Sequence, residues 1–217
     1  MNVRLISVTK AVGEGVDGIS AEELTAYVAR VSNPSNQMNS ETAPKLLAYC
    51  IKNNHWSVFE HVNFTVEVKT SRAIAAQILR HRSAVFQEFS QRYAEAMDNE
   101  FYPARRQDLK NRQNSIDDMD EEHKAWFNQA QKDNWDRSLA LYKEALTRGI
   151  AKEQARFLLP LSTQTTLYMT NNLRNWMHYI DLRTTPGTQL EHREIAEGVK
   201  EIFKEQFPTI ATAKGWL

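Results

Sequence analysis

Residues 62–69, Val-Asn-Phe-Thr-Val-Glu-Val-Lys, alternate apolar and polar side chains over their whole length. A period of two is typical of a β-strand with one buried face, because successive side chains point to opposite sides of a sheet. Residues 70–82 follow with isoleucines at helical spacing, and Thr70 or Ser71 can cap a helix there. This stretch therefore predicts a half-buried strand that leads directly into a helix packed against it.

Further elements are predicted on both sides of this pair. Strands are expected at 2–9 and 166–170. Helices are expected where apolar residues recur at helical spacing, at 20–31, about 46–51, 118–148 and 151–159, from Asn171 or Asn172 as the cap to about 183, and from 189 to before Pro208. Residues 98–116 are polar without periodicity and predict a surface excursion. Because helices and strands mix without regular βαβ alternation, we expect one α+β domain over 1–217, a small antiparallel or mixed sheet packed by helices.

The composition is that of a globular protein, with 41% apolar and 25% charged residues. The formal net charge is +0, which argues against a general nucleic-acid binder but not against binding of one phosphorylated metabolite. Cys50 is the only cysteine, so no disulfide forms within the chain. No apolar run is long enough for a signal peptide or a membrane span, and a cytoplasmic location is expected.

Polar residues that suit a binding site begin near the end of the 70–82 helix. Gln77, Arg80 and His81 would share one helix face at spacings of three and four residues. A simpler alternative is that the basic residues only complement the helix dipole. Residues 85–93 then interleave apolar and polar side chains, and Arg92 could bind a phosphate in bidentate fashion. In isolation this segment could also be a plain edge strand.

The spacing of these residues carries a more specific signal. Arg80-His81-Arg82 is followed by seven residues and Ser90, and then by Arg92-Tyr93. This pattern resembles the signature of the flavin-dependent thymidylate synthases. Further blocks resemble that family in the same order along the chain: Ala29–Ser32, His55–His61, Ala155–Pro160, Asn172–Arg174 and Leu182–Arg183.

The resemblance implies an enzyme that methylates dUMP to dTMP. It implies methylenetetrahydrofolate as carbon donor, FAD as hydride carrier, NADPH as reductant and a homotetrameric assembly. FAD would be held by side chains and helix ends, because the chain has no Rossmann glycine motif. Two alternatives stay open at this point. One is a non-catalytic nucleotide-binding protein of the same fold, and the other is a nucleic-acid-binding module that uses the arginines.

The resemblance also implies roles for individual residues. Arg183 would be catalytic, by stabilising charge that develops on the uracil. The residues expected around dUMP are Gln77, Arg80, Glu88, Ser90, Gln91, Arg92, Arg156 and Arg183. The residues expected around FAD are His55, Ser57, Arg80, His81, Arg82, Glu88, Asn172, Arg174 and His178. Gln87 and His178 stand where the family usually has Asn, so the contacts at these two positions are expected to differ.

Other reactive side chains have simpler interpretations. Cys50 lies on an apolar helix face and is expected to be buried rather than nucleophilic. His61 beside Glu60 is either a structural pair or a ligand contact. Residues 117–122 are acidic and predict a helix N-terminus rather than a calcium loop. The histidines have no metal-ligand spacing, so no metal site is expected.

Overall fold

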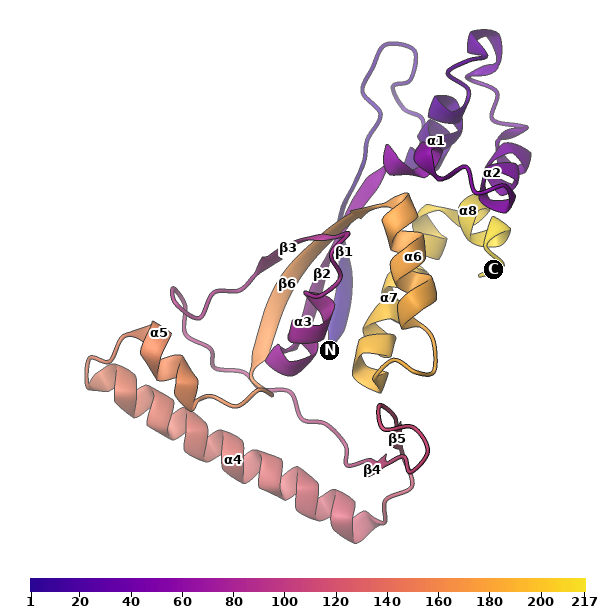
Figure 1. Ribbon diagram of the computed structural model, residues 1–217. Helices are drawn as coiled ribbons and strands as arrows, with labels where there is room; N and C mark the ends of the chain where they lie inside the picture. Colours follow the sequence, from indigo (N-terminus) through magenta and orange to yellow (C-terminus); the bar gives the residue numbers. More distant parts are fainter.

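Two long strands form the centre of the sheet in the computed structural model, which describes residues 1–217: β2 (Asn63–Ser71) and β6 (Gln164–Asn172). They pair antiparallel along their full length. The outer strands are β1 (Asn2–Val8), which pairs with β2, and β3 (Val85–Glu88), which pairs with β6. The sheet order is β1-β2-β6-β3 with every neighbour antiparallel (Figure 1), as the α+β prediction allows.

One face of the sheet carries the main core. Phe64, Val66 and Val68 of β2 are buried on it, which confirms the alternation read from the sequence. Two helices lie alongside this face (Figure 1): α6 (Leu173–Arg183) and α7 (Leu190–Gln206). Burying each large apolar side chain in this layer contributes roughly 1.5–3 kcal/mol, so the layer fixes the position of α6 relative to the sheet.

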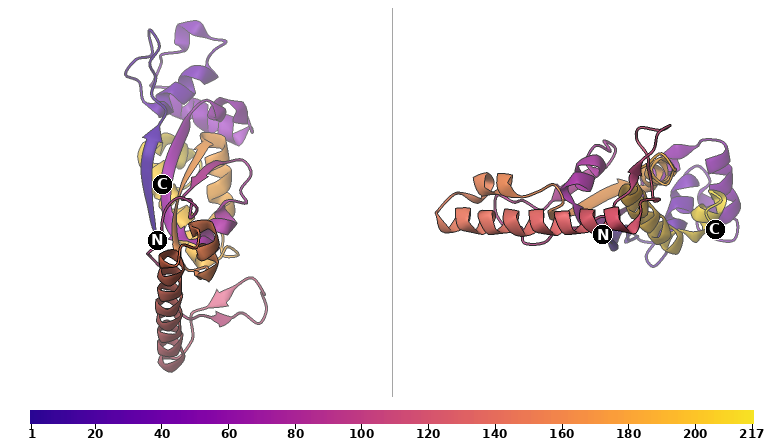
Figure 2. Two further views of the ribbon diagram at one scale, coloured as in Figure 1. Left: turned by 90° about the vertical axis from the view of Figure 1, so that its left-hand side faces the viewer. Right: turned by 90° about the horizontal axis from the view of Figure 1, so that it is seen from below.

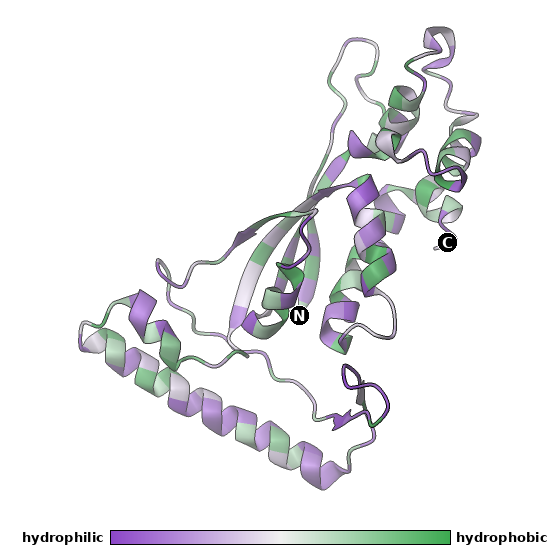
Figure 3. Ribbon diagram, in the orientation of Figure 1, coloured by the Kyte–Doolittle hydropathy of each residue, from purple (hydrophilic) through white to green (hydrophobic).

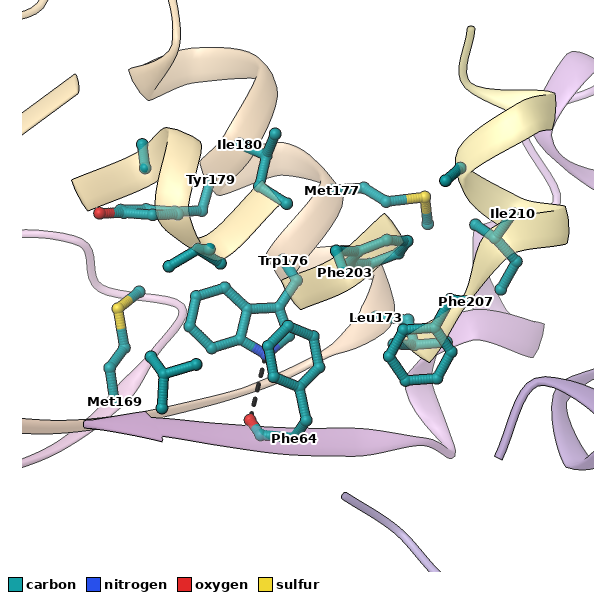
Figure 4. Close-up of a cluster of buried hydrophobic side chains, with 14 of the residues drawn as sticks. Phe64, Met169, Leu173, Trp176, Met177, Tyr179, Ile180, Phe203, Phe207 and Ile210 are labelled. Atoms are coloured by element: carbon teal, nitrogen blue, oxygen red, sulfur yellow. Dashed lines mark hydrogen bonds between the residues drawn. The ribbon is translucent and has the colours of Figure 1, made fainter. Parts of the chain in front are cut away.

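Aromatic stacking joins α6 to β2. The rings of Trp176 and Phe64 stack with their centroids 4.5 Å apart and an interplanar angle of 16°. The Trp176 indole Nε1 donates a hydrogen bond of 3.1 Å to the Phe64 carbonyl (Figure 4). Phe203 and Phe207 pack against the same Phe64 ring. This hydrogen bond satisfies the only polar atom of the fully buried Trp176 indole, so the packing leaves no buried donor without a partner.

A group of helices closes one end of the sheet, and the C-terminus lies there (Figures 1 and 2). These helices are α1 (Ala21–Ala29), α2 (Ala43–Lys52) and α8 (Pro208–Ala213). The Ser20 side chain caps α1, and Glu23 reaches back to the Ser20 backbone in a capping box. The other short elements are η1 (Pro34–Asn36), η2 (Trp56–Glu60) and α3 (Arg72–Ile78).

An arm extends from the opposite end of the sheet (Figure 2). It consists of α4 (Glu121–Thr147), α5 (Lys152–Ala155) and η3 (Arg156–Leu158). Only Trp135, Tyr142 and Ala145 of α4 are buried, and apolar positions are scattered along the helix (Figure 3). Gln131 binds the arm to the preceding loop, because its side chain hydrogen-bonds both the N–H and the carbonyl of Tyr102.

The structure departs from the sequence predictions in several places. The polar excursion at 98–116 contains a small hairpin of two-residue strands, β4 (Arg106–Gln107) and β5 (Ser115–Ile116), which are too short to show periodicity. α8 and η2 were not predicted. The 70–82 helix ends early, at Ile78, so the prediction that Gln77, Arg80 and His81 share a helix face was wrong. No helix is both long and apolar enough to cross a membrane.

Candidate functional site

The turn after α3 presents the Arg-His-Arg motif. Backbone bonds from Arg80 to Gln77 and from His81 to Ile78 span three residues, so the helix tightens and ends there. The middle residue, His81, is consequently buried, while Arg80 and Arg82 point to solvent. The Ser83 hydroxyl lies 2.8 Å from His81 Nε2. The motif therefore has one inward imidazole between two exposed guanidinium groups.

His81 belongs to a buried cluster with residues of α6 and α7. Its ring meets the edge of Tyr179 at a centroid distance of 5.1 Å and lies 5.8 Å from the ring of His178. The Tyr179 hydroxyl is hydrogen-bonded to His192 Nε2 at 3.1 Å. Arg183, one helical turn beyond Tyr179, is half-buried, and its Nε has no hydrogen-bond partner. The fold thus brings the predicted catalytic arginine next to the predicted flavin residues His81 and His178.

The charge state of this cluster is set by burial. The pKa of His81 is lowered to about 4, mainly by its burial and in smaller part by its neighbours His178 and Arg183. Burial also lowers the pKa of His192 to about 4, with Arg183 and His81 adding to the effect. The pKa of Tyr179 is raised, because its burial disfavours the phenolate. Near neutral pH, the guanidinium of Arg183 is therefore a cation beside the neutral side chains of His81, His192 and Tyr179.

Gln77 lies beside this cluster and is held by a residue that the sequence did not single out. Its Nε2 donates to Gln189 Oε1, just before α7. Gln189 in turn donates from Nε2 to Glu191 Oε2 at 2.9 Å. These two hydrogen bonds fix the orientation of the Gln77 side-chain amide. A fixed amide suits a residue that is predicted to contact dUMP.

A second group of predicted residues lies near α5, after β3. Arg92 Nε donates to Glu153 Oε2 at 3.1 Å, and Arg156 Nε donates to the Glu153 carbonyl at 3.1 Å. The side chains of Arg92 and Glu153 are 61% and 47% exposed. Ser90 accepts from the backbone N–H of Arg92, which holds the turn. Arg92 thus meets the carboxylate of Glu153 and Arg156 its backbone carbonyl, so both guanidinium groups lie near one residue, where they could also bind a phosphate.

Glu88 and Gln91 connect this second group to the sheet. Glu88 ends β3, and its Oε1 accepts from Arg72 Nη1 at 2.8 Å and from Thr165 Oγ1 at 3.0 Å. Gln91 is buried, with 7% of its surface exposed. Glu88 is therefore a hydrogen-bond acceptor with a fixed orientation, since a guanidinium group and a hydroxyl both bind its Oε1.

A third group lies around η2 and the start of α6. A cavity of about 450 Å³ there is lined by Trp56, Arg174 and His178 among others. Arg174 forms an ion pair with Glu60. The partner of Glu60 is therefore Arg174. This contact does not support the interpretation of Glu60 and His61 as a structural pair. The structure connects this group to the first one, because His178 also contacts His81.

Three other predicted flavin residues, His55, Ser57 and Asn172, belong to η2 and the start of α6 but do not line this cavity. His55 and Ser57 are exposed at η2, and the His55 ring lies edge-on to Tyr49 at 5.7 Å. Asn172 caps α6, because its Oδ1 accepts from the Asn175 N–H at 2.9 Å. That acceptor is therefore committed to the helix, and a ligand would meet the amide group of Asn172 instead. The cap also confirms the predicted start of this helix.

Nucleophilic and metal-dependent chemistry have little support at these groups. Cys50 is buried within α2, and burial raises the pKa of its thiol, so the thiolate is disfavoured. This confirms its buried interpretation. No three His, Cys, Asp or Glu side chains come together as a metal site.

The donor set fits a flavin and a nucleotide. Exposed or half-buried arginines can meet phosphate oxygens, and the unpaired Nε–H of Arg183 is a buried donor that still requires an acceptor. The His178 ring, which lines the cavity, can lie against a planar ring system. The fold and these groups together define an α+β protein that binds anionic, planar ligands.

Comparison with known proteins identifies the family. The sequence model described as "Thymidylate synthase complementing protein" matches residues 16–209. The chain is 56% identical to a probable flavin-dependent thymidylate synthase of Paramecium bursaria Chlorella virus 1, with both chains covered completely. It is 55% identical to a flavin-dependent thymidylate synthase of Synechocystis sp., again over the full length of both.

A solved structure shows the same fold. The UMP/dUMP methylase PolB from Streptomyces cacaoi, crystallised with 5-Br dUMP, superimposes with a TM-score of 0.82 at 24% identity, over 99% of this chain and 94% of that one. At this identity the likeness supports the fold alone. The chain belongs to the thymidylate synthase complementing protein family, and the resemblance inferred from Arg80 to Tyr93 is confirmed.

Proposed function

We propose that this chain is a flavin-dependent thymidylate synthase that methylates dUMP to dTMP, with methylenetetrahydrofolate as carbon donor and NADPH as reductant. The observation that carries the proposal is the position of Arg183, a half-buried cation with an unpaired Nε–H beside His81 of the family signature. The names of full-length relatives at 55% and 56% identity support the same activity.

Electrostatic activation of the uracil follows from this arrangement. Adding a carbon at C5 requires electron density on the pyrimidine ring, and a thiolate route through Cys50 is blocked by its burial. Arg183 can instead stabilise negative charge that develops on the ring. Its neighbours His81 and His192 are neutral near pH 7, so no second buried cation repels it. Because the Arg183 guanidinium is already in place and partly shielded from water, it can stabilise this charge without any rearrangement of the site during the reaction.

The nucleotide phosphate is assigned to Arg92 and Arg156. Arg92 donates to the Glu153 carboxylate and Arg156 to the Glu153 backbone carbonyl, so both guanidinium groups lie close to this residue. A dianionic phosphate would compete with the carboxylate for Arg92 and gain bidentate contacts of roughly 1.5–3 kcal/mol each. Ser90 and Gln91 lie in the same turn and would add neutral contacts, and Glu88 would accept from the sugar. Gln77 and Arg80 would meet the base from the Arg183 side.

FAD is assigned to the groups around His81 and the cavity near η2. The residues that would hold it are His55, Ser57, Arg80, His81, Arg82, Glu88, Asn172, Arg174 and His178. When bound, the reduced flavin supplies the hydride that completes the methyl group. The protein's part is to orient the ligands and exclude water. Arg174 would exchange its ion pair with Glu60 for the flavin's phosphates.

The site is proposed to be completed by other copies of the chain in a homotetramer. Within one chain, the cavity that contains Arg174 and His178 includes neither Arg92, which follows β3, nor Arg156, which begins η3 after α5. Large apolar side chains also remain exposed near the second group: Val85 is 72%, Tyr93 82% and Phe157 76% exposed. Association would bury this surface and bring the α5 group of one chain to the Arg183 cluster of another.

Turnover assays with matched arginine variants test the proposal. Arg183→Ala and Arg92→Ala should retain the fold but lose dTMP formation by at least about 100-fold, as removal of one charge-stabilising donor typically does. Arg148→Ala is the control, since Arg148 is exposed on the arm and pairs only with Glu144. Undiminished turnover in both site variants would reject these roles. dUMP binding without any turnover would favour a non-catalytic protein, and salt-sensitive RNA binding would favour a nucleic-acid module.

A further inference from the structure

A second cavity contains none of the residues assigned above to dUMP or FAD, and it adjoins the first group at Gln189. It has a volume of about 490 Å³, within the range of small-molecule sites. Its walls come from the β4–β5 hairpin, the first two turns of α4 and the residues that begin α7. Figure 1 shows the hairpin between the start of α4 and the lower end of α7. The cavity thus occupies the junction of the arm and the sheet domain.

The floor of this cavity is fixed and buried. Arg105 and Glu191 form an ion pair whose side chains are 11% and 4% exposed. Gln189 donates to the other oxygen of Glu191 and accepts from Gln77. Because Gln77 is assigned to dUMP, this chain of hydrogen bonds places the cavity next to the proposed nucleotide position.

Aromatic side chains form the walls. Tyr102 is held by its hydroxyl, which donates to Ser71 Oγ at 2.7 Å, and by Gln131 at its backbone. Trp126 and Phe127 face the cavity from α4. Trp126 is 68% exposed, which is unusual for an indole that has no partner to cover it. The walls therefore suit a flat aromatic group.

The cavity carries one uncompensated positive charge. Arg105 is neutralised by Glu191, and His123 is hydrogen-bonded to Asp120 at 2.7 Å. Arg112, by contrast, lines the cavity, is exposed and forms no ion pair. An aromatic ligand with a carboxylate would place its ring on the walls and its charge at Arg112.

We propose that this cavity binds the aminobenzoyl-glutamate half of methylenetetrahydrofolate, an inference that rests on the proposed function. Among the three proposed co-reactants, this is the part that joins an aromatic ring to free carboxylates. The hydrogen-bonded path from Gln189 to Gln77 would direct the remaining, carbon-carrying half toward the nucleotide. Arg112 then contributes to folate selection and takes no part in the chemistry.

Steady-state kinetics with two carbon donors tests the proposal. The donors are methylenetetrahydrofolate and methylenetetrahydropteroate, which lacks the glutamate. The wild type should prefer the folate, and Arg112→Ala should lose about fivefold of that preference while the KM values for dUMP and NADPH stay unchanged. Arg112→Lys should recover part of it. Leu109→Ala is the control, because Leu109 lies on the same loop, is 89% exposed and does not line the cavity.

Direct binding separates this proposal from the proposed function. N-(4-aminobenzoyl)-L-glutamate should quench the tryptophan fluorescence of the wild-type protein, and the quenching should be lost in Trp126→Phe. Quenching in a protein that makes no dTMP would support the cavity and reject the enzyme. An unchanged folate preference in Arg112→Ala, or a rise in the KM for NADPH in place of the folate effect, would overturn the cavity's assignment.

Discussion

Replacing Tyr179 by Phe and His192 by Leu together removes a buried, titratable pair from between α6 and α7. Both side chains are fully buried, and a 3.1 Å hydrogen bond joins them. Removing both partners leaves no unpaired hydroxyl, so the cost at neutral pH should be small. The pH dependence of stability, in contrast, should change.

The magnitude follows from the pKa of His192, which burial lowers to about 4 from an unfolded value of 6.5. At pH 5 the unfolded histidine is mostly protonated and the folded one mostly neutral, so the unfolded state binds more protons. The free energy of unfolding therefore decreases as the pH falls from about 6.5 to about 4. Proton linkage with these two pKa values gives a decrease of about 2 kcal/mol by pH 5. Well above pH 6.5, His192 is neutral in both the folded and the unfolded state, and it causes no loss of stability.

Urea unfolding of the flavin-free protein at pH 7.5 and pH 5, at one protein concentration, measures this effect. Between pH 7.5 and pH 5, the free energy of unfolding of the wild type should fall because both His81 and His192 stay neutral in the folded protein. In the double variant, this fall should be about 2 kcal/mol smaller than in the wild type, because His192 is absent. Tyr179→Phe alone is the control, because it keeps the histidine. If the double variant and Tyr179→Phe lose equal stability at pH 5, His192 is not held neutral by burial and the reasoning fails.

Three further predictions concern the core, a helix cap and the phosphate site. Phe64→Ala should destabilise the protein by about 3–5 kcal/mol, seen as a lower urea midpoint, because it empties the centre of the stack with Trp176; a loss below about 1 kcal/mol would contradict this packing. Ser20→Ala should cost about 1 kcal/mol through the lost cap of α1, and Ser20→Asp should restore it. Glu153→Gln should lower the KM for dUMP by about two- to fivefold, because the charged competitor for Arg92 is removed from an exposed ion pair. A raised KM would show that Glu153 helps to bind the nucleotide.

Local sequence patterns predicted those parts of the fold that depend on neighbouring residues. The alternation in residues 62–69 predicted β2, and the cap of α3 by Ser71 and the capping box of α1 were both readable. The end of α3 at Ile78 was not, because no proline or glycine marks it. The short strands of the 98–116 hairpin lacked any period.

Contacts between distant residues could not be predicted from the chain alone. Arg92 meets Glu153, 61 residues away, only because the arm returns to the turn that follows β3. Tyr179 and His192 pair only because α6 packs on α7, and a single histidine on an amphipathic helix gives no signal of that partner. The family resemblance implied roles for His81 and Arg183 from two separate blocks, the Arg80–Ser90 signature and Leu182–Arg183, whereas their proximity is a result of the fold.

The visible absorption spectrum of the purified protein, before and after NADPH and with or without dUMP, tests the central claim most directly. The account predicts a bound flavin that is bleached by NADPH at a rate that changes when dUMP is added. A colourless protein that takes up no added FAD would contradict it.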